Sequence, residues 1–493
     1  MNPNLTRQFS NSIIILIFFS ISIVQAQVDT LWTKTFGGIY SDFGYSIQQT
    51  IDEGYIITGS TYSSFSAGKY DAWLIKTNAD GDTLWTKTFG EFDSEYSYSV
   101  QQTADEGYII TGSKATFDGN GSDVWLIKTD ADGDTLWTKT FYGYYSTNCG
   151  KSIQQTEDEG YIIVGFTEAW DYSDGFIWLI KTNASGDTLW TKTFGGSQRE
   201  YGNSIQQTVD EGYIITGSTL SFGAGGSDVW LIKTNASGDT LWTRTFGGNG
   251  QDDGNSVQQT TDEGYIITGS TSSYGVGSRD IWLIKTNASG DTLWTKTFGG
   301  RGEDCGYAVQ QTTDEGYIIT GYTSSFPAGV RDAWLIKTSA SGDILWTKTF
   351  GGSDNDDGYS VRQTLDGGYI ITGFTSSYGS GDYDVWLIKT TPDVNTIYED
   401  HNGITSDYKL HQNYPNPFNP STTIKFQIPN SNLTTLKIYD ILGQEVVTLL
   451  EGNLQAGEHK VQFNASDLAS GVYFYRLQVG QNWVQMRKMV LVK

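Results

Sequence analysis

The sequence predicts an all-β fold whose main part is a seven-bladed β-propeller of four-stranded blades, covering about residues 28–391. The first observation behind this prediction is a phrase that recurs along the chain and is least distorted at Asp228–Phe246. A fixed period of about 50 residues is typical of repeat arrays and propellers. The second tryptophan of the phrase returns every 52 or 53 residues, at Trp32, Trp85, Trp137, Trp190, Trp242, Trp294 and Trp346.

The second observation is that each period holds four short runs rich in β-branched and aromatic residues, which is the pattern of strands. In the fifth repeat the links Thr261–Gly264 and Asn287–Asp291 are short and contain a glycine, as tight hairpins do, whereas the other connections are long. A four-stranded meander then places both hairpins at one end of the blade and both long loops at the other. The expected strands of this repeat are Ser256–Thr260, Tyr265–Thr268, Ile281–Thr286 and Thr292–Phe298.

The third observation is the phase in which the repeats run. The repeats begin with a fourth-strand run at Leu31–Phe36 and end with a third-strand run at Val385–Thr390. An open solenoid needs polar capping repeats, yet the first and last copies read like the middle ones. We therefore expect a closed ring in which the N-terminal strand completes the last blade, and seven repeats lie within the usual range of about four to eight blades.

Composition excludes several classes of function. The chain holds 31 basic and 56 acidic residues, and a net charge of −25 repels nucleic acid. The predicted propeller has no histidine, which excludes His-based triads and His-ligated metal centres there. We assign no catalytic residue and expect a monomer without a cofactor, calcium being the one alternative. Cys149 and Cys305 fall in loops nearly opposite each other in the ring, so both are expected to be free thiols.

The N-terminus has the pattern of a secretory signal peptide, assigned to residues 1–26. Arg7 precedes an apolar run at Ile13–Val24, and small residues lie at the expected cleavage site near Ala26. A membrane anchor would need about 20 apolar residues, so we expect no transmembrane segment in the mature chain. The signal peptide implies that the inner-membrane secretion machinery handles the chain first.

A second module follows the repeats, with residues 392–408 as a linker and residues 409–493 as the module itself. It contains four segments in order: an Asn-Pro-Phe opening, a Leu-Gly segment, a Ser-Gly-Val-Tyr segment and a lysine-flanked end. Together these closely resemble the type A C-terminal sorting domain of the type IX secretion system. The residues that carry the resemblance are Asn413, Tyr414, Pro415, Asn416, Pro417, Phe418, Gly443, Gly471, Lys488 and Lys493.

The resemblance implies a small C-terminal β-sandwich that the outer-membrane type IX machinery of Bacteroidota-type bacteria recognises. The protein is then expected to cross the periplasm and to end up secreted or attached to the outer-membrane surface. The sequence departs from many relatives at Phe463, where they carry tryptophan. The alternative is a generic adhesive sandwich without a sorting role.

Carboxylates recur at one place in the long loops, four residues before the serine or its equivalent of each expected first strand. A ring of such acids could hold calcium, which prefers several oxygen ligands. Alternatively, each acid accepts hydrogen bonds from loop amides and orders its own loop. The aspartates at this place include Asp42, Asp252, Asp304 and Asp356.

The third repeat deviates most from the others, and function needs asymmetry unless the ligand repeats as well. An aromatic platform among acids is a common way to hold a carbohydrate, so we expect a glycan or protein site on the long-loop face. One alternative is a carboxylate-dependent hydrolase or lyase using a pair that includes Glu168 or Asp171; another is a structural spacer without ligand. The site residues assigned here are Glu168, Trp170, Asp171, Tyr172 and Asp174.

Overall fold

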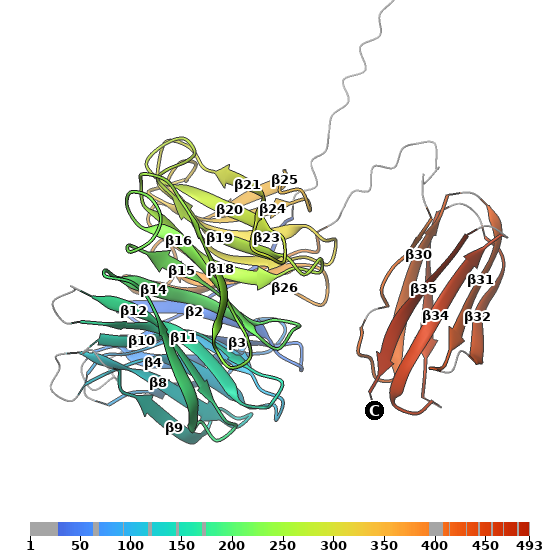
Figure 1. Cartoon of the computed structure of the whole chain (residues 1–493), viewed down its shortest axis with the longest axis horizontal. Helices are drawn as coiled ribbons and strands as arrows, with labels where there is room; N and C mark the ends of the chain where they lie inside the picture. The colour runs from blue at the N-terminus through green and yellow to red at the C-terminus, as the bar shows by residue number, and fades with distance from the viewer. Residues whose placement is uncertain are drawn as a thin grey trace, which may run out of the picture. The chain divides into compact units, whose positions relative to one another are not determined.

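A computed structural model of the chain describes residues 28–62, 69–91, 93–116, 121–143, 147–169, 174–393, 408–413, 415–429, 431–441, 444–454, 457–466, 468–480 and 483–492 (Figure 1). The chain divides into two compact units, Met1–Val394 and Asn395–Lys493. The regular structure within the described ranges is all β-strand, and no helix there has the length and hydropathy of a membrane span. The predicted signal peptide lies outside the described residues.

The described residues of the first unit form twenty-eight strands in repeating sets of four. The inner strands are β2 (Asp42–Gln49), β6 (Glu95–Gln102), β10 (Thr147–Gln155), β14 (Glu200–Gln207), β18 (Asp252–Gln259), β22 (Asp304–Gln311) and β26 (Asp356–Gln363). The second strands are β3 (Tyr55–Thr61), β7 (Tyr108–Ala115), β11 (Tyr161–Glu168), β15 (Tyr213–Thr219), β19 (Tyr265–Thr271), β23 (Tyr317–Thr323) and β27 (Tyr369–Thr375). The third strands are β4 (Asp71–Thr77), β8 (Ser122–Thr129), β12 (Gly175–Thr182), β16 (Asp228–Thr234), β20 (Asp280–Thr286), β24 (Asp332–Thr338) and β28 (Asp384–Thr390). The outer strands are β1 (Thr30–Phe36), β5 (Thr83–Phe89), β9 (Thr135–Phe141), β13 (Thr188–Phe194), β17 (Thr240–Phe246), β21 (Thr292–Phe298) and β25 (Ile344–Phe350).

Each set forms an antiparallel meander, which we call a blade and number from β2 onward. In six blades the four strands follow one another in sequence, and a single residue pairing, Thr147 with Ser122, links the second blade to the third. The last blade has the order β1-β28-β27-β26, so its outer strand comes from the N-terminal side of the repeats. The predicted all-β fold of repeated four-stranded units closed by the N-terminal strand is therefore confirmed.

A ring of glutamine side chains joins neighbouring blades. The last glutamine of each inner strand accepts a hydrogen bond from a backbone N–H in the first turn of the preceding blade. Gln102 Oε1 lies 2.9 Å from Ile51 N, and Gln49 Oε1 lies 3.0 Å from Leu365 N, which joins the last blade to the first. The other bonds run from Ala104, Glu157, Val209, Thr261 and Thr313 to Gln155, Gln207, Gln259, Gln311 and Gln363.

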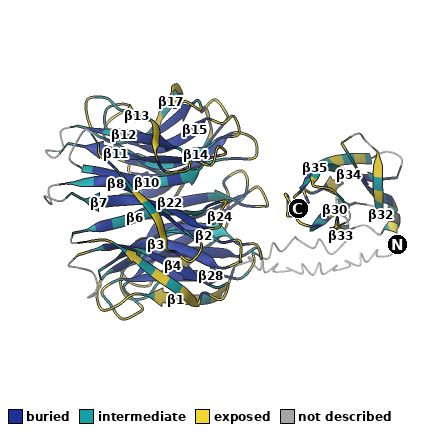
Figure 2. Ribbon diagram, turned by 90° about the horizontal axis from the view of Figure 1, so that it is seen from below, coloured by how far each residue is buried: buried dark blue, intermediate teal, exposed yellow. Residues whose placement is uncertain are grey.

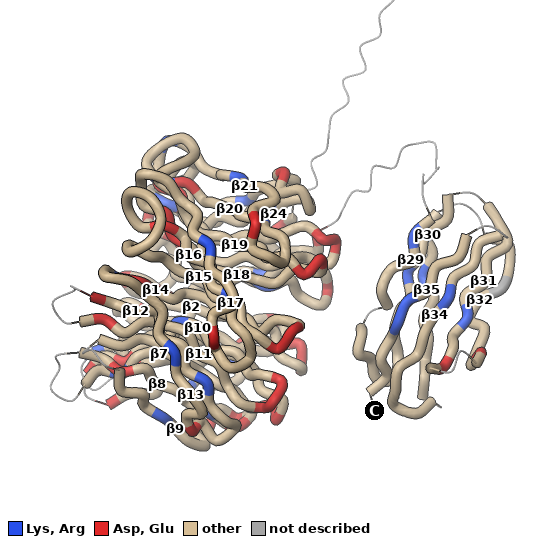
Figure 3. Tube along the Cα trace, in the orientation of Figure 1, with Lys and Arg blue, Asp and Glu red and all other residues tan. Residues whose placement is uncertain are grey.

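The core lies in the second and third strands, which are the darkest elements in Figure 2. Their Ile-Ile and Trp-Leu-Ile runs face neighbouring blades on both sides, so they are apolar without alternation. The outer strands alternate between exposed and half-buried residues. Each third strand also buries a lysine: Lys285 is 3% exposed, and its Nζ lies 2.9 Å from Oδ2 of Asp262 in the first hairpin turn. These turns account for much of the acidic colour in Figure 3.

The second unit consists of two antiparallel sheets around one apolar core. One sheet has the order β29-β30-β33 and the other β32-β31-β34-β35. Ile424, Leu436 and Tyr475 come from both sheets and are fully buried in the same cluster, so the unit is a small β-sandwich. Its strands are β29 (Lys409–Leu410), β30 (Ser421–Ile428), β31 (Asn432–Tyr439), β32 (Glu445–Leu454), β33 (Gly457–Asn464), β34 (Gly471–Val479) and β35 (Trp483–Leu491).

Candidate binding site at the long-loop end

Every inner strand contains a β-bulge at its fourth or fifth residue. In β18 the register shifts between Gly254 and Ser256, which leaves Asn255 unpaired with β19. Bulges occur often next to functional sites because they redirect a side chain. The bulge residue differs between blades although its neighbours are nearly constant. We call these side chains the bulge ring, and they are Tyr45, Tyr98, Lys151, Asn203, Asn255, Tyr307 and Tyr359.

Four consecutive blades contribute tyrosines to the bulge ring. The ring centroids of Tyr307 and Tyr359 lie 4.6 Å apart, those of Tyr359 and Tyr45 5.4 Å, and those of Tyr45 and Tyr98 5.2 Å. Tilted aromatic pairs at such distances attract each other. Burial raises the pKa of Tyr45 to about 12, so its hydroxyl stays neutral near pH 7 and can donate a hydrogen bond.

The other three blades contribute polar side chains. Lys151 Nζ lies 3.6 Å from the ring centroid of Tyr98, which is a cation–π contact. Asn203 Nδ2 donates to Gly254 O at 2.9 Å, and Asn255 Nδ2 donates to Gly306 O at 2.8 Å. These bonds fix the two amides against the next blade and leave each Oδ1 as an acceptor. The bulge ring is therefore aromatic on one arc and polar on the other.

A pocket of about 390 Å³ lies along the polar arc. Its volume falls in the range of about 300–1,000 Å³ that is usual for small-ligand sites. Its wall combines aromatic rings, amides and charged groups, and Cys305 also lines it. Cys305 and Cys149 are both buried free thiols. The two free cysteines agree with the prediction. The lining residues are Lys151, Phe166, Tyr201, Asn203, Ser218, Asp253, Asn255, Arg279, Cys305, Tyr307 and Tyr322.

Two arginine–aspartate ion pairs lie in this region. Arg279 Nη2 donates to Asp253 Oδ2, and Arg279 Nε donates to Ser270 Oγ at 2.7 Å. In the next blades Arg331 Nε lies 2.7 Å from Asp357 Oδ1, which is buried. Burial raises the pKa of Asp357 to about 7 although Arg331 opposes the shift. Arg279 thus engages Asp253 within the fifth blade, and Arg331 of the sixth blade engages Asp357 of the seventh.

The structure describes two of the five side chains predicted as a site in the third repeat. Glu168 ends β11 and is 4% exposed. Its Oε1 accepts a hydrogen bond from Tyr201 OH at 2.8 Å and faces Arg199 Nη1 at 3.5 Å. Because Tyr201 lines the pocket, Glu168 lies behind the pocket wall. Asp174 is half-buried, and its backbone O accepts a hydrogen bond from Ala169 N at 2.9 Å. Trp170, Asp171 and Tyr172 lie outside the described residues.

The four predicted loop aspartates each begin an inner strand and accept hydrogen bonds from their own blade. Asp356 Oδ2 accepts from Gly352 N at 2.9 Å and from Ser377 Oγ at 2.6 Å. Asp252 and Asp304 make the equivalent contacts, and Asp42 accepts from Gly38 N at 2.9 Å. Among the described residues, no three His, Cys, Asp or Glu side chains converge as a metal site would need. These contacts order the loops.

Glu95 occupies the same place in the second blade but lacks one partner. The other six blades have a threonine at the position of Lys114, and in the fourth blade Thr219 Oγ1 donates to the equivalent Glu200 at 3.1 Å. Glu95 is 1% exposed, and burial raises its pKa to about 7. An unfolded glutamate has a pKa of about 4.3. Between about pH 4.3 and pH 7 the folded state therefore keeps a proton on Glu95 that the unfolded state has lost.

We therefore expect Glu95 to make the protein less stable as pH rises from about 4.3 to 7, because ionisation of its buried carboxyl is disfavoured. Glu95→Gln should remove this dependence, so that the variant gains stability over the wild type as pH rises. Denaturant unfolding at several pH values measures the difference. Glu200→Gln is the matched control and should keep the wild-type dependence. Parallel curves for wild type and Glu95→Gln would contradict the expectation.

The predictions from sequence missed the bulge ring. Residues such as Asp253, Gly254 and Asn255 favour turns, so they were assigned to the loop before the strand, but the structure pairs them with β19. A usable signal was present, since the residue before the conserved serine changes from Tyr45 to Lys151 while its neighbours repeat.

The residues of the predicted sorting motif lie where the start of the second unit meets its last strand. Asn413 Nδ2 donates to Pro415 O and to Thr422 Oγ1, both at 3.0 Å. Asn416 Oδ1 accepts from Val490 N at 2.7 Å, and buried Phe418 exchanges backbone hydrogen bonds with β35 and the residue after it. Pro417 lies between them, Gly471 begins β34 and Lys488 lies in β35, whereas Tyr414, Gly443 and Lys493 lie outside the described residues. The motif thus fastens the C-terminal strand.

Solved structures similar to this chain include two of low sequence identity. A novel fungal alcohol oxidase of the AA5 family, in complex with copper, has 9% identity and a TM-score of 0.47, covering 95% of this chain and 100% of that chain. The β-propeller domain of the Trilobed protease from Pyrococcus furiosus has 10% identity and a TM-score of 0.40, covering 72% and 97%. Neither structure indicates what this chain binds.

Two sequence comparisons concern different parts of the chain. Over 347 residues it is 24% identical to the regulatory protein FlaEY of Caulobacter vibrioides, which covers 65% of this chain and 33% of that protein. The chain thus spans about a third of the length of this relative. Residues 412–493 match the family of the secretion system C-terminal sorting domain. The second unit is therefore a type IX sorting domain, and the protein is a β-propeller exported to the medium or to the outer-membrane surface.

Proposed function

We propose that the propeller is a binding module that recognises a glycan through the pocket on the polar arc of the bulge ring. The observation that carries this proposal is the inequality of the ring: seven equivalent backbone positions present four tyrosines on one arc and Lys151, Asn203 and Asn255 on the other. A purely structural ring has no need for this difference. Fixed amides beside aromatic rings provide hydrogen bonds to hydroxyl groups and flat surfaces for sugar rings.

The contacts of the nearby carboxylates support binding rather than catalysis. The carboxylates near the pocket are held by other side chains: Asp253 by Arg279, and Glu168 by Tyr201 and Arg199. Glycoside hydrolysis needs two carboxylates about 5–10 Å apart that are available as acid and base or nucleophile, whereas these acids are engaged by neighbouring side chains. The hydrolase alternative would require turnover on a panel of polysaccharides, and the spacer alternative would require that no glycan binds.

The test is a substitution that fills the pocket without disturbing the backbone. Asn255→Tyr introduces the residue that four other blades carry at the same bulge, so the fold should tolerate it. We expect it to weaken binding to the best ligand of a glycan array by about tenfold or more, equivalent to about 1.4 kcal/mol. Val276→Tyr, at a loop residue that is 66% exposed, is the matched control and should bind like the wild type. Unchanged glycan binding by Asn255→Tyr would refute this site, and capture of a protein instead of a glycan would change the ligand class.

A further inference from the structure

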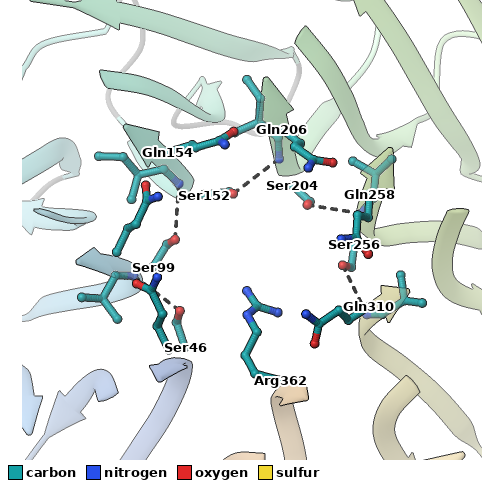
Figure 4. Close-up of a pocket in the computed structure, with 17 residues that line it drawn as sticks. Ser46, Ser99, Ser152, Gln154, Ser204, Gln206, Ser256, Gln258, Gln310 and Arg362 are labelled. Atoms are coloured by element: carbon teal, nitrogen blue, oxygen red, sulfur yellow. Dashed lines mark hydrogen bonds between the residues drawn. The ribbon is translucent and has the colours of Figure 1, made fainter. Parts of the chain in front are cut away.

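The seven inner strands surround a central channel. At its hairpin end they enclose a second cavity of about 290 Å³, which is separate from the pocket at the long-loop end. Its wall is built from a ring of serines and a ring of glutamines, and Arg362 replaces the glutamine in the last blade. Figure 4 shows the Arg362 side chain reaching into the middle of the ring. The glutamines of the ring are Gln48, Gln101, Gln154, Gln206, Gln258 and Gln310.

The acceptor atoms of these glutamines are already used. Gln258 Oε1 accepts a hydrogen bond from Gln311 N at 2.6 Å, and Gln310 Oε1 accepts from Gln363 N at 2.8 Å. The other four make the same bond to the next blade at 2.6 Å. The Nε2 atoms of these six glutamines donate no hydrogen bond to any described residue. The glutamine ring therefore offers N–H donors to the cavity and keeps its carbonyl oxygens in the wall.

Arg362 adds a charge to this ring of donors. Its Nη1 donates to Val361 O at 3.0 Å, which orients the guanidinium, and no ion pair joins it to an acid of the described chain. Burial alone lowers its pKa below the usual value, yet an arginine stays protonated in proteins. The guanidinium is half-buried at the cavity and has no counter-ion among the described residues. A charge that has lost part of its hydration is stabilised by an opposite charge, so an anion in the cavity would stabilise the folded state.

We propose that the hairpin end of the channel is a binding site for a small inorganic oxyanion of the sulfate or phosphate type, held by the Arg362 guanidinium and the Nε2 amides of the glutamine ring. The planar guanidinium can donate two parallel hydrogen bonds to such an anion. The remaining oxygens face amide donors from several blades. The site is independent of glycan recognition, because the two sites use different residues at opposite ends of the inner strands.

The experiment is isothermal titration of sulfate, and separately of phosphate, into the full chain in a zwitterionic buffer free of both ions, together with thermal unfolding. We expect saturable binding of one anion per chain and a rise in Tm that follows it. Arg362→Gln gives the last blade the residue of the other six, so it should fold and should lose at least about tenfold in affinity, equivalent to about 1.4 kcal/mol. Arg362→Lys keeps the charge but not the planar fork and should bind with intermediate affinity.

Two further variants separate this site from general salt effects. Gln310→Glu keeps an oxygen for Gln363 N and places a counter-charge in the same ring, so it should abolish anion binding. Arg244→Gln removes an arginine from an exposed pair with Asp291 and should bind like the wild type. Sulfate stabilises most proteins by exclusion from their surface, and that effect should be equal in all variants. Equal, saturable binding by wild type and Arg362→Gln, or no saturable binding by the wild type, would overturn the proposal.

Discussion

Deletion of residues 409–493 is expected to hold the protein in the periplasm, with loss of almost all of it from the medium and the cell surface. Residues 412–493 are the part of the chain that matches the sorting domain, and they form a separate unit with its own core. Cell fractionation and immunoblotting of the deletion strain measure the result. Arrival of the truncated chain at the cell surface would contradict the sorting assignment.

Two controls make this deletion interpretable. The truncated protein purified from the periplasm should show the propeller's unfolding transition at the wild-type temperature, because each unit has its own apolar core. A finer variant is Asn416→Ala, which removes the acceptor that holds Val490 N. It should reduce export less than the deletion does, while Leu433→Ala, at a residue of β31 that is 51% exposed, should leave export unchanged.

Removal of β1 is expected to cost the propeller about 3 kcal/mol of unfolding free energy or more. Trp32 and Phe36 are half-buried against the cluster that contains Ile47 and Tyr55 of the first blade. Loss of one fully buried aromatic ring costs about 3–5 kcal/mol, and two half-buried rings together with the strand pairing should cost about as much. Lys34 also pairs with Asp82 of the first blade at 2.8 Å. Denaturant unfolding of chains that begin at residue 28 and at residue 38 measures the difference.

The role of β1 as the closing strand has its own controls. A synthetic peptide of residues 28–37 should bind the shortened chain and restore part of its stability, since β28 then offers an unpaired edge. Leu31→Ala changes a side chain that is 56% exposed and should have little effect. A shortened chain as stable as the longer one would show that β1 does not hold the ring closed.

Sequence reasoning was most reliable where the repeat itself carried the information. Strand order, the glycine hairpins and the completion of the last blade by the N-terminal run follow from periodicity and turn residues, because local chemistry decides them. The inner strand was harder, since Asp252–Asn255 have the composition of a turn and enter β18 through long-range pairing. The bulge ring lies in this stretch, whereas the sequence predicts the site in the loop around Trp170.

The sorting motif shows the same division between local and long-range information. Its order along the chain was enough to recognise it, but the contact between Asn416 and Val490 joins positions 74 residues apart. Arg362 was visible as a departure from the repeated glutamine, yet its meaning depends on six side chains from six other blades. No single repeat contains that information.

The glutamine bonds between blades have a consequence for how such a protein can change over evolutionary time. Each bond joins a backbone N–H to one glutamine that every repeat keeps, so this set of bonds between blades uses neither the bulge residue nor the long loops. A mutation at the position of Asn203 or Lys151 therefore alters the bulge ring and its own contacts but leaves the glutamine bonds between blades in place. A gene of nearly identical repeats can in this way acquire new recognition one blade at a time, while the others preserve its stability.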